Sequence, residues 1–180
     1  MNICILIPGF IKSYEHLEFL QNLFKSINAD KIYVFGHIFS YIISPNINKN
    51  KIIYDNINNN IDTNKLTIFN SFSYVSDNYE KYDKDGYDNR IYSQWFNVKK
   101  SFDLYLDFSK KNNIKCDMFI RMRSDLHISD ITMLNNIITQ SYISNKIIFF
   151  TPSCHVVNDQ LFIGPYTLFN KIMLLSDNIY

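Results

Sequence analysis

The sequence predicts an α/β fold with a mainly parallel sheet flanked by helices, and three observations predict it. Short apolar segments typical of buried strands alternate with longer segments whose apolar residues recur every three or four positions. The first strand, helix and strand fit into about thirty-five residues, which is typical of a βαβ unit with parallel strands. The segment 117–123 is a nearly continuous apolar run, as expected for a central parallel strand.

The amino-terminal βαβ unit is bounded by residues that interrupt regular structure. A strand over 2–7 ends at Pro8-Gly9, and a second strand over 31–35 ends at Gly36. Between them, Ser13 can cap a helix. The apolar positions of that helix recur at intervals of three and four residues: Leu17, Leu20, Phe24 and Ile27.

The rest of the chain continues the alternation of strands and helices. The strongest helix pattern runs from Asn89 to about Lys110, with an apolar stripe at Ile91, Trp95, Val98, Phe102 and Tyr105. The other predicted strands are 52–54, 66–69, 117–123 and 146–150, the other helices are 131–139 and 165–175, and an Asn-rich loop covers 56–64.

Composition indicates one folded domain over residues 1–180. Hydrophobic residues make up 47% of the chain and charged residues 19%, which is typical of a globular protein. A net charge of +1 gives no reason to expect a nucleic-acid partner.

Cysteine usage and the first residues bear on the compartment. The three cysteines are scattered without a Cys-x-x-Cys motif, which argues against a disulfide framework and favours a reducing compartment. The apolar run at the start is too short for a signal peptide or a membrane span. We therefore expect a cytoplasmic protein without a membrane span.

Two arginines and an aspartate close the central strand at alternate positions: Arg121, Arg123 and Asp125. Side chains two residues apart in a strand point to the same side, and ligands of open α/β sheets bind beyond the carboxyl ends of the strands. Two guanidinium groups beside one carboxylate suit a phosphorylated ligand, with the carboxylate free to hold a divalent metal. The alternative is an Arg–Asp salt bridge that closes the strand end, with the deeper Arg121 as a buried structural partner.

A second polar group, Asn158-Asp159-Gln160, follows about thirty residues later, before Gly164-Pro165. A carboxylate such as Asp159 can act as a general base when it lies within reach of the proton that it removes. Asn-Asp also favours turns, so an Asx turn is the alternative. In a parallel sheet this loop should emerge at the same edge as the end of the 117–123 strand, so that Asp159 and Asp125 face one cleft.

Together, segments 121–126 and 158–164 resemble a family of glycosyltransferase-like proteins related to bacterial lipopolysaccharide synthesis, also found in giant viruses. The family pattern is a strand ending in Arg-x-Arg-x-Asp-Leu, then Asn-Asp-Gln before an aromatic-Gly segment. The helix start at 92–96 and the chain start at 5–12 also resemble the family. Relatives usually have Arg where this chain has Lys12, which keeps the charge but loses the bidentate fork.

The resemblance implies the GT-A type of nucleotide-sugar transferase fold. It also implies transfer of a sugar from a nucleoside-diphosphate donor to a hydroxyl acceptor, in glycan or lipopolysaccharide-type synthesis. The nucleotide sugar and a glycan acceptor would be the partners. In this family frame, Arg121, Arg123, Lys12, Asn158 and Gln160 are expected to bind the donor or its sugar hydroxyls.

Two carboxylates are expected to carry the chemistry. The resemblance implies that Asp125 ligates a manganese or magnesium ion that bridges the donor phosphates, and that Asp159 deprotonates the acceptor hydroxyl. GT-A enzymes usually have an Asp-x-Asp pair at this point, whereas this chain has a single acid. Neutralisation of the phosphates by the arginines is therefore the alternative to a metal.

A second function is compatible with the same residues: a catalytically inactive relative that only binds a nucleotide or a glycan. The single Asp favours it, as does the short C-terminus. Relatives continue past the last helix, so the chain is expected to be either a truncated copy or a minimal domain. A third interpretation is an unrelated α/β interaction module.

Overall fold

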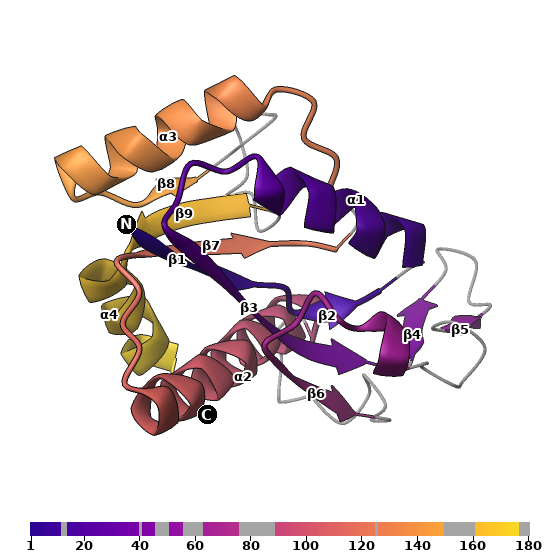
Figure 1. The fold of residues 1–180 in the computed structure, drawn as a ribbon. Coiled ribbons are helices and arrows are strands. Elements are labelled where there is room, and N and C mark those ends of the chain that lie inside the picture. Colours follow the sequence, from indigo (N-terminus) through magenta and orange to yellow (C-terminus); the bar gives the residue numbers. More distant parts are fainter. Residues whose placement is uncertain are drawn as a thin grey trace.

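The computed structural model describes residues 1–11, 14–39, 41–45, 51–55, 63–75, 89–124, 126–149 and 161–176. The helices among these residues are α1 (Tyr14–Lys25), α2 (Asn89–Asn112), α3 (Ile131–Ser144) and α4 (Tyr166–Ser176). A sheet lies between them, with α1 and α3 on one face and α2 and α4 on the other (Figure 1). This arrangement confirms the predicted α/β class.

The sheet is mixed, so the expectation of a mainly parallel sheet is confirmed only for part of it. Its described strands follow the spatial order β6-β3-β1-β7-β9-β8, and β2 also lies beside β3. Strands β6, β3, β1 and β7 run parallel, whereas β9 is antiparallel to both of its neighbours. The bounds are β1 (Asn2–Leu6), β2 (Gly9–Phe10), β3 (Lys31–Phe39), β6 (Ser71–Val75), β7 (Met118–Met122), β8 (Ile148–Phe149) and β9 (Leu161–Pro165), with β4 (Tyr41–Pro45) and β5 (Lys51–Asp55) forming a separate antiparallel pair.

Strand β2 continues β1 after a short interruption. Leu6 lies beside Phe35 and Gly9 beside Ile38, so both strands keep the same register against β3. Pro8 has no amide hydrogen for the ladder. Gly9 has a φ of 97°, a conformation that glycine adopts without steric cost. The predicted break at Pro8-Gly9 is therefore confirmed, although the chain then resumes its line along β3.

Two predicted strand limits in the first half are wrong. Strand β3 does not end at Gly36 but runs through it to Phe39. A Cβ atom at Gly36 would lie 2.5 Å from the ring of Phe69, so the glycine serves a close approach and not a turn. The predicted strand over 66–69 is also wrong. These residues contain a turn that follows a 3-10 helix at Thr63–Lys65, and the next strand, β6, begins at Ser71.

The last third of the chain contains a strand that the pattern did not reveal. Of the predicted 146–150 strand, the structure describes 146–149, and among these only the two residues of β8 are in a strand. Strand β9, taken in the sequence as the end of a loop, is fully buried between β7 and β8. Gly164 lies inside this strand, and the position favours glycine because a Cβ atom there would lie 2.7 Å from Cγ1 of Ile147. Pro165 is its last residue, opposite Met118.

Helix α3 has both ends capped by its own neighbours. The side chain of Asp130 accepts a hydrogen bond from the backbone N–H of Met133 at 2.8 Å. Asn145 ends the helix in the left-handed region, with a φ of 50°. In the last turn, the buried Ser141 hydroxyl donates to the carbonyl oxygens of Lys146 and Ile163, which ties α3 to β9.

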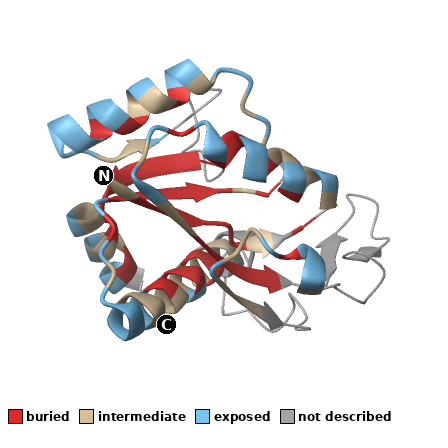
Figure 2. Ribbon diagram, viewed as in Figure 1, coloured by how far each residue is buried: buried red, intermediate tan, exposed pale blue. Residues whose placement is uncertain are grey.

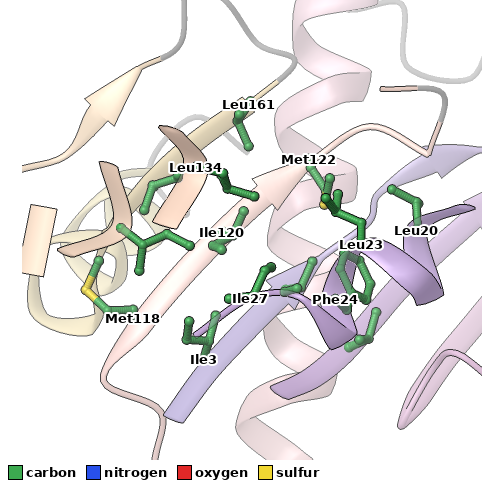
Figure 3. Packing of buried hydrophobic residues seen from close by; sticks show 14 of the residues in the cluster. Ile3, Leu20, Leu23, Phe24, Ile27, Met118, Ile120, Met122, Leu134 and Leu161 are labelled. Atoms are coloured by element: carbon green, nitrogen blue, oxygen red, sulfur yellow. The ribbon is translucent and has the colours of Figure 1, made fainter. Parts of the chain in front are cut away.

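The face of the sheet under α1 and α3 is an aliphatic core. Buried residues line the sheet and the inner sides of the helices (Figure 2). Figure 3 shows Ile3, Ile120 and Met122 of the sheet beside Leu23 and Phe24 of α1. Each buried aliphatic side chain contributes about 1.5–3 kcal/mol through removal of its surface from water.

The face under α2 and α4 is aromatic over most of its extent. The rings of Phe119 and Tyr105 meet edge to face at 4.8 Å, and those of Phe119 and Phe169 lie 5.1 Å apart. We call the buried side chains that make up this packing the aromatic end of the α2 layer: Phe35, Phe102, Tyr105, Phe119 and Phe169.

Candidate functional site

The parallel strands β1, β3, β6 and β7 end at one edge of the sheet, which we call the carboxyl edge. Ligands of open α/β sheets bind at such edges. Strand β7 brings both predicted arginines there. Arg121 is its fourth residue, and Arg123 directly follows its last residue.

The two arginines differ in burial. Arg121 is only 2% exposed, whereas Arg123 is partly exposed. By strand alternation, Arg121 points to the same face as Phe119, toward α2. A partly exposed arginine can meet a ligand that arrives from solvent, while a buried one supports the strand end. This geometry agrees with Arg121 as the structural partner and Arg123 as the ligand contact.

Side chains from helix α2 reach the strands around Arg121. Leu6 and Phe162 are its neighbours in the adjoining strands. The ring of Trp95, in the first half of α2, lies 5.8 Å from that of Phe162. One pleat back along β7, Phe119 packs against Phe102 of α2 at 5.6 Å. The helix lies mainly over β3, β6 and β1, and the side chains of Trp95 and Phe102 reach from it to β9 and β7 near the buried arginine.

Buried polar side chains gather at the same place. The described residues include six buried polar or charged side chains, and five of them lie on β3, on α2 opposite it, or at the end of β7. We call four of these the polar end of the α2 layer: His37, Asn97, Ser101 and Arg121. Of the other two, Ser124 lies in the turn after β7, and Ser141 lies on the opposite face of the sheet, on α3.

His37 links three elements at the polar end. Its ring nitrogen Nδ1 lies 2.5 Å from the hydroxyl oxygen of Ser73 on β6. Its backbone N–H donates to the hydroxyl oxygen of Ser101 on α2 at 2.9 Å, and that hydroxyl donates to the carbonyl oxygen of Asn97. The ring also meets Phe96 of α2 in an edge-to-face contact at 6.0 Å.

Sequence reasoning did not select His37, Asn97 or Ser101, because it sought metal-ligand spacings and His37 has none. A different signal was present. His37 is a polar residue inside an apolar strand, and Asn97 and Ser101 stand one turn apart along the edge of the apolar stripe of a helix. Polar residues on faces that must be buried need hydrogen-bond partners and so mark places of interest.

Five predicted site residues lie outside the described residues: Lys12, Asp125, Asn158, Asp159 and Gln160. The structure does, however, describe the chain that flanks them. Ile11 is buried just before Lys12, Ser124 is buried just before Asp125, and Leu161 begins β9 directly after Gln160.

The flanking residues of the two motifs meet at the carboxyl edge. Leu161 pairs with Met122, the last residue of β7. Phe149 ends β8, which runs in the same direction as β7 because both are antiparallel to β9. The segment between β8 and β9 therefore leaves from the carboxyl edge and returns to it. The expected reason, a parallel sheet, is wrong for β9, but the described ends of the segment lie at the expected edge.

A metal ion would need a group of ligands, and the described residues do not contain one. Within them, no three His, Cys, Asp or Glu side chains are placed to hold an ion, and the predicted ligand Asp125 is not one of these residues. His127, two positions after Asp125, is exposed and stacks on Phe19 of α1 with ring centroids 4.6 Å apart.

Two ionisable side chains in or beside the aromatic end have raised pKa values. Burial raises the pKa of the Cys4 thiol well above its ordinary value, and the neighbouring Cys116 side chain adds to the shift. Burial also raises the pKa of the Tyr105 phenol, although a hydrogen bond from the backbone N–H of Cys116 opposes this. Charged forms are thus disfavoured at this end of the layer.

The chain matches no protein-family model, no curated protein and no solved structure. Among the described residues, no helix is both long and apolar enough to cross a membrane.

Proposed function

We propose that this chain is a glycosyltransferase that moves a sugar from a nucleoside-diphosphate donor to a hydroxyl acceptor of a glycan. The observation that carries the proposal is the pairing of Met122 with Leu161. It brings the described ends of both polar motifs to the carboxyl edge, beside Arg121 and Arg123. The motif resemblance supplies the reaction class, and the α/β sheet with its carboxyl edge is compatible with it.

The chemical task is to stabilise the negative charge that grows on the leaving diphosphate. Arginine suits this task, because its guanidinium group binds phosphate oxygens in a bidentate manner and stays charged. Arg123, partly exposed at the end of β7, is assigned to the diphosphate. Asp159 is assigned as the base that removes the proton of the acceptor hydroxyl.

A divalent metal is the other means of neutralising the diphosphate. The described residues supply arginines at the carboxyl edge but no group of metal ligands. We therefore assign the neutralising role to Arg123, with manganese or magnesium at Asp125 as the competing assignment. If Asp125 binds a metal, Asp125→Asn abolishes the manganese-dependent part of nucleotide binding.

The experiment measures binding and turnover in the same preparation. Thermal unfolding is followed with uridine and guanosine diphosphates, with manganese or with a chelator, because a ligand of the native state raises the melting temperature. Sugar-nucleotide hydrolysis is then measured for the wild type and for Asp159→Asn. We expect this variant to bind nucleotide and to lose turnover, because a base acts in the chemical step.

Two results would change the assignment. Nucleotide binding without turnover in the wild type would favour the second function, an inactive relative that binds a nucleotide or glycan. The single acid at Asp125, in place of an acidic pair, is the observation that favours this alternative. No stabilisation by any nucleotide at millimolar concentration would overturn both functions and favour an interaction module.

A further inference from the structure

His37 has a position that neither the predicted motifs nor the proposed chemistry uses. It lies in β3, two residues beyond Phe35 of the aromatic end, and it is 5% exposed. Phe35, Leu6 and Arg121 lie side by side in three adjacent strands. His37 is therefore one pleat nearer the carboxyl edge than Arg121, on the same face and under the same helix.

The contacts of His37 hold α2 against the sheet at this point. The Ser73 hydroxyl fixes the ring from β6, and the Ser101 hydroxyl connects the His37 backbone to α2. Farther along, the helix is held by aromatic packing and by a hydrogen bond from the backbone N–H of Cys116 to the Tyr105 hydroxyl oxygen. Hydrogen bonds to fixed backbone and ring atoms have narrow geometric limits. The contacts of His37 therefore set the position of the first half of α2, where the Trp95 ring packs against Phe162, the neighbour of Arg121.

We propose that His37 is a positioning residue for the arginines of the carboxyl edge, acting through Ser73 and through α2. With the His37–Ser73 and His37–Ser101 contacts formed, α2 keeps Trp95 packed against Phe162 beside Arg121, which holds the end of β7 in one geometry. Arg123 directly follows that strand end, so a fixed strand end holds its guanidinium group in position for a diphosphate. This inference rests on the proposed nucleotide binding, but its structural part can be measured without any ligand.

Trp95 is the built-in probe of the structural part. It is the single tryptophan of the chain, and it lies on α2 against Phe162, the neighbour of Arg121. A change in how α2 sits on this edge alters the access of acrylamide to the Trp95 ring. Quenching of its fluorescence therefore reports the position of the helix at the polar end.

Four variants separate the His37–Ser73 hydrogen bond from ring packing and from general destabilisation. His37→Phe keeps a ring for the contact with Phe96 but has no nitrogen, whereas His37→Asn places an amide near the position of Nδ1. Ser73→Ala removes the other partner. Ser141→Ala is the matched control, because it removes a buried hydroxyl with two hydrogen bonds on the opposite face.

We expect His37→Phe and Ser73→Ala to raise the acrylamide quenching constant by about a factor of two, because a ring that Ser73 no longer orients packs less well against Phe96 of α2 and the helix then opens more often. Nucleotide affinity should fall by about tenfold in both, because small misplacement of a charged contact is costly. His37→Asn should stay near the wild type in both measurements. Ser141→Ala should lower stability and leave quenching and affinity unchanged.

The outcomes are distinguishable. Wild-type quenching in both folded His37→Phe and Ser73→Ala would overturn the inference, as would a His37→Asn variant no better than His37→Phe. Should His37→Phe fail to fold, Ser73→Ala decides, because its substitution on the outer strand β6 leaves the ring in place. If the wild type binds no nucleotide, the proposed function fails, and increased quenching in Ser73→Ala then still supports the control of α2 by His37.

Discussion

The two ends of the α2 layer share β3, β7 and α2 and differ in their buried side chains, although Phe169 of α4 also belongs to the aromatic end. Along β3, Phe35 is followed on the same face by His37, and along β7, Phe119 is followed by Arg121. Along α2, which covers both ends, the buried residue after Ser101 is Phe102. The change from the aromatic end to the polar end occurs within one pleat of the sheet.

The aromatic end supplies stability to the layer, whereas stability alone does not explain the buried polar side chains of the polar end. Burial of aromatic rings is favourable, whereas burial of polar groups is costly unless each group is hydrogen-bonded. A layer selected only for stability would continue the aromatic packing to the edge. The polar end instead lies at the carboxyl edge, where α/β folds bind ligands. Substitutions at the two ends should therefore have separable effects.

The largest expected effect is at the aromatic end. Phe119 is fully buried and its ring contacts those of Phe102, Tyr105, Tyr166 and Phe169. We expect Phe119→Ala to lower the free energy of unfolding by about 3–5 kcal/mol, from lost burial and the cavity left behind. Urea denaturation measures this value. A loss below about 1 kcal/mol would mean that the aromatic end does not hold the layer together.

Arg123→Ala should show the reverse pattern at the carboxyl edge, next to the polar end. Loss of a charge-assisted contact to phosphate costs about 1.5–3 kcal/mol, which is about tenfold or more in nucleotide affinity. The free energy of unfolding should change by less than about 0.5 kcal/mol, because the side chain is partly exposed. Titration calorimetry and urea denaturation of one preparation give both numbers. Equal loss of stability and affinity would remove the distinction between the two ends.

Ser101→Ala tests the boundary between the ends. The variant leaves the buried backbone N–H of His37 without its acceptor. We expect the free energy of unfolding to fall by about 1–3 kcal/mol, the cost of an unsatisfied buried donor. Hydrogen exchange of the His37 amide should accelerate at the same time. An unchanged exchange rate would show that this hydrogen bond does not hold α2.

The smallest effect concerns the pH dependence of the aromatic end. Since burial raises the pKa of Cys4, the folded thiol keeps its proton at pH values where the unfolded thiol loses it. The contribution to stability is therefore complete below about pH 8.5 and is lost as the pH rises above it, by at most about 1.4 kcal/mol per pH unit. Urea denaturation between neutral and alkaline pH, with Cys4→Val as the control, measures the slope. An equal slope in both proteins would contradict the raised pKa assigned to Cys4.

The sequence predicted the parts of the fold in which one local pattern decides the structure. Strand β1, the helices α1 and α2, and the central strand β7 follow from apolar periodicity. Gly36 was taken as a strand end because glycine usually interrupts strands, but its role depends on the ring of Phe69, more than thirty residues away. No local pattern contains that contact.

Strand β9 escaped prediction for a related reason. Its Gly164-Pro165 ending is typical of a loop, yet Gly164 makes room for Ile147 and Pro165 is the final residue of the strand. Its direction is also not encoded locally, because buried parallel and antiparallel strands have the same apolar composition.

Among the described residues of the candidate site, the sequence predicted the two arginines. It did not predict the residues that support them. Arg121 and Arg123 stand out because charges rarely end an apolar strand at alternate positions. His37 and Ser101 act through neighbours that only the folded chain provides, namely Ser73 and the turn of α2. Reasoning from motifs therefore found the groups that could meet a ligand and not those that hold them.

The most direct test of nucleotide binding at the carboxyl edge is a titration of the wild type, Arg123→Ala and Ser141→Ala with uridine and guanosine diphosphates, followed by the fluorescence of Trp95. We expect a saturable change in the wild type with at least one nucleotide, the same affinity in Ser141→Ala, and affinity weaker by about tenfold in Arg123→Ala. Equal affinities in the wild type and Arg123→Ala, or no saturable change by fluorescence and calorimetry in the wild type, would contradict a nucleotide site at the carboxyl edge beside the polar end.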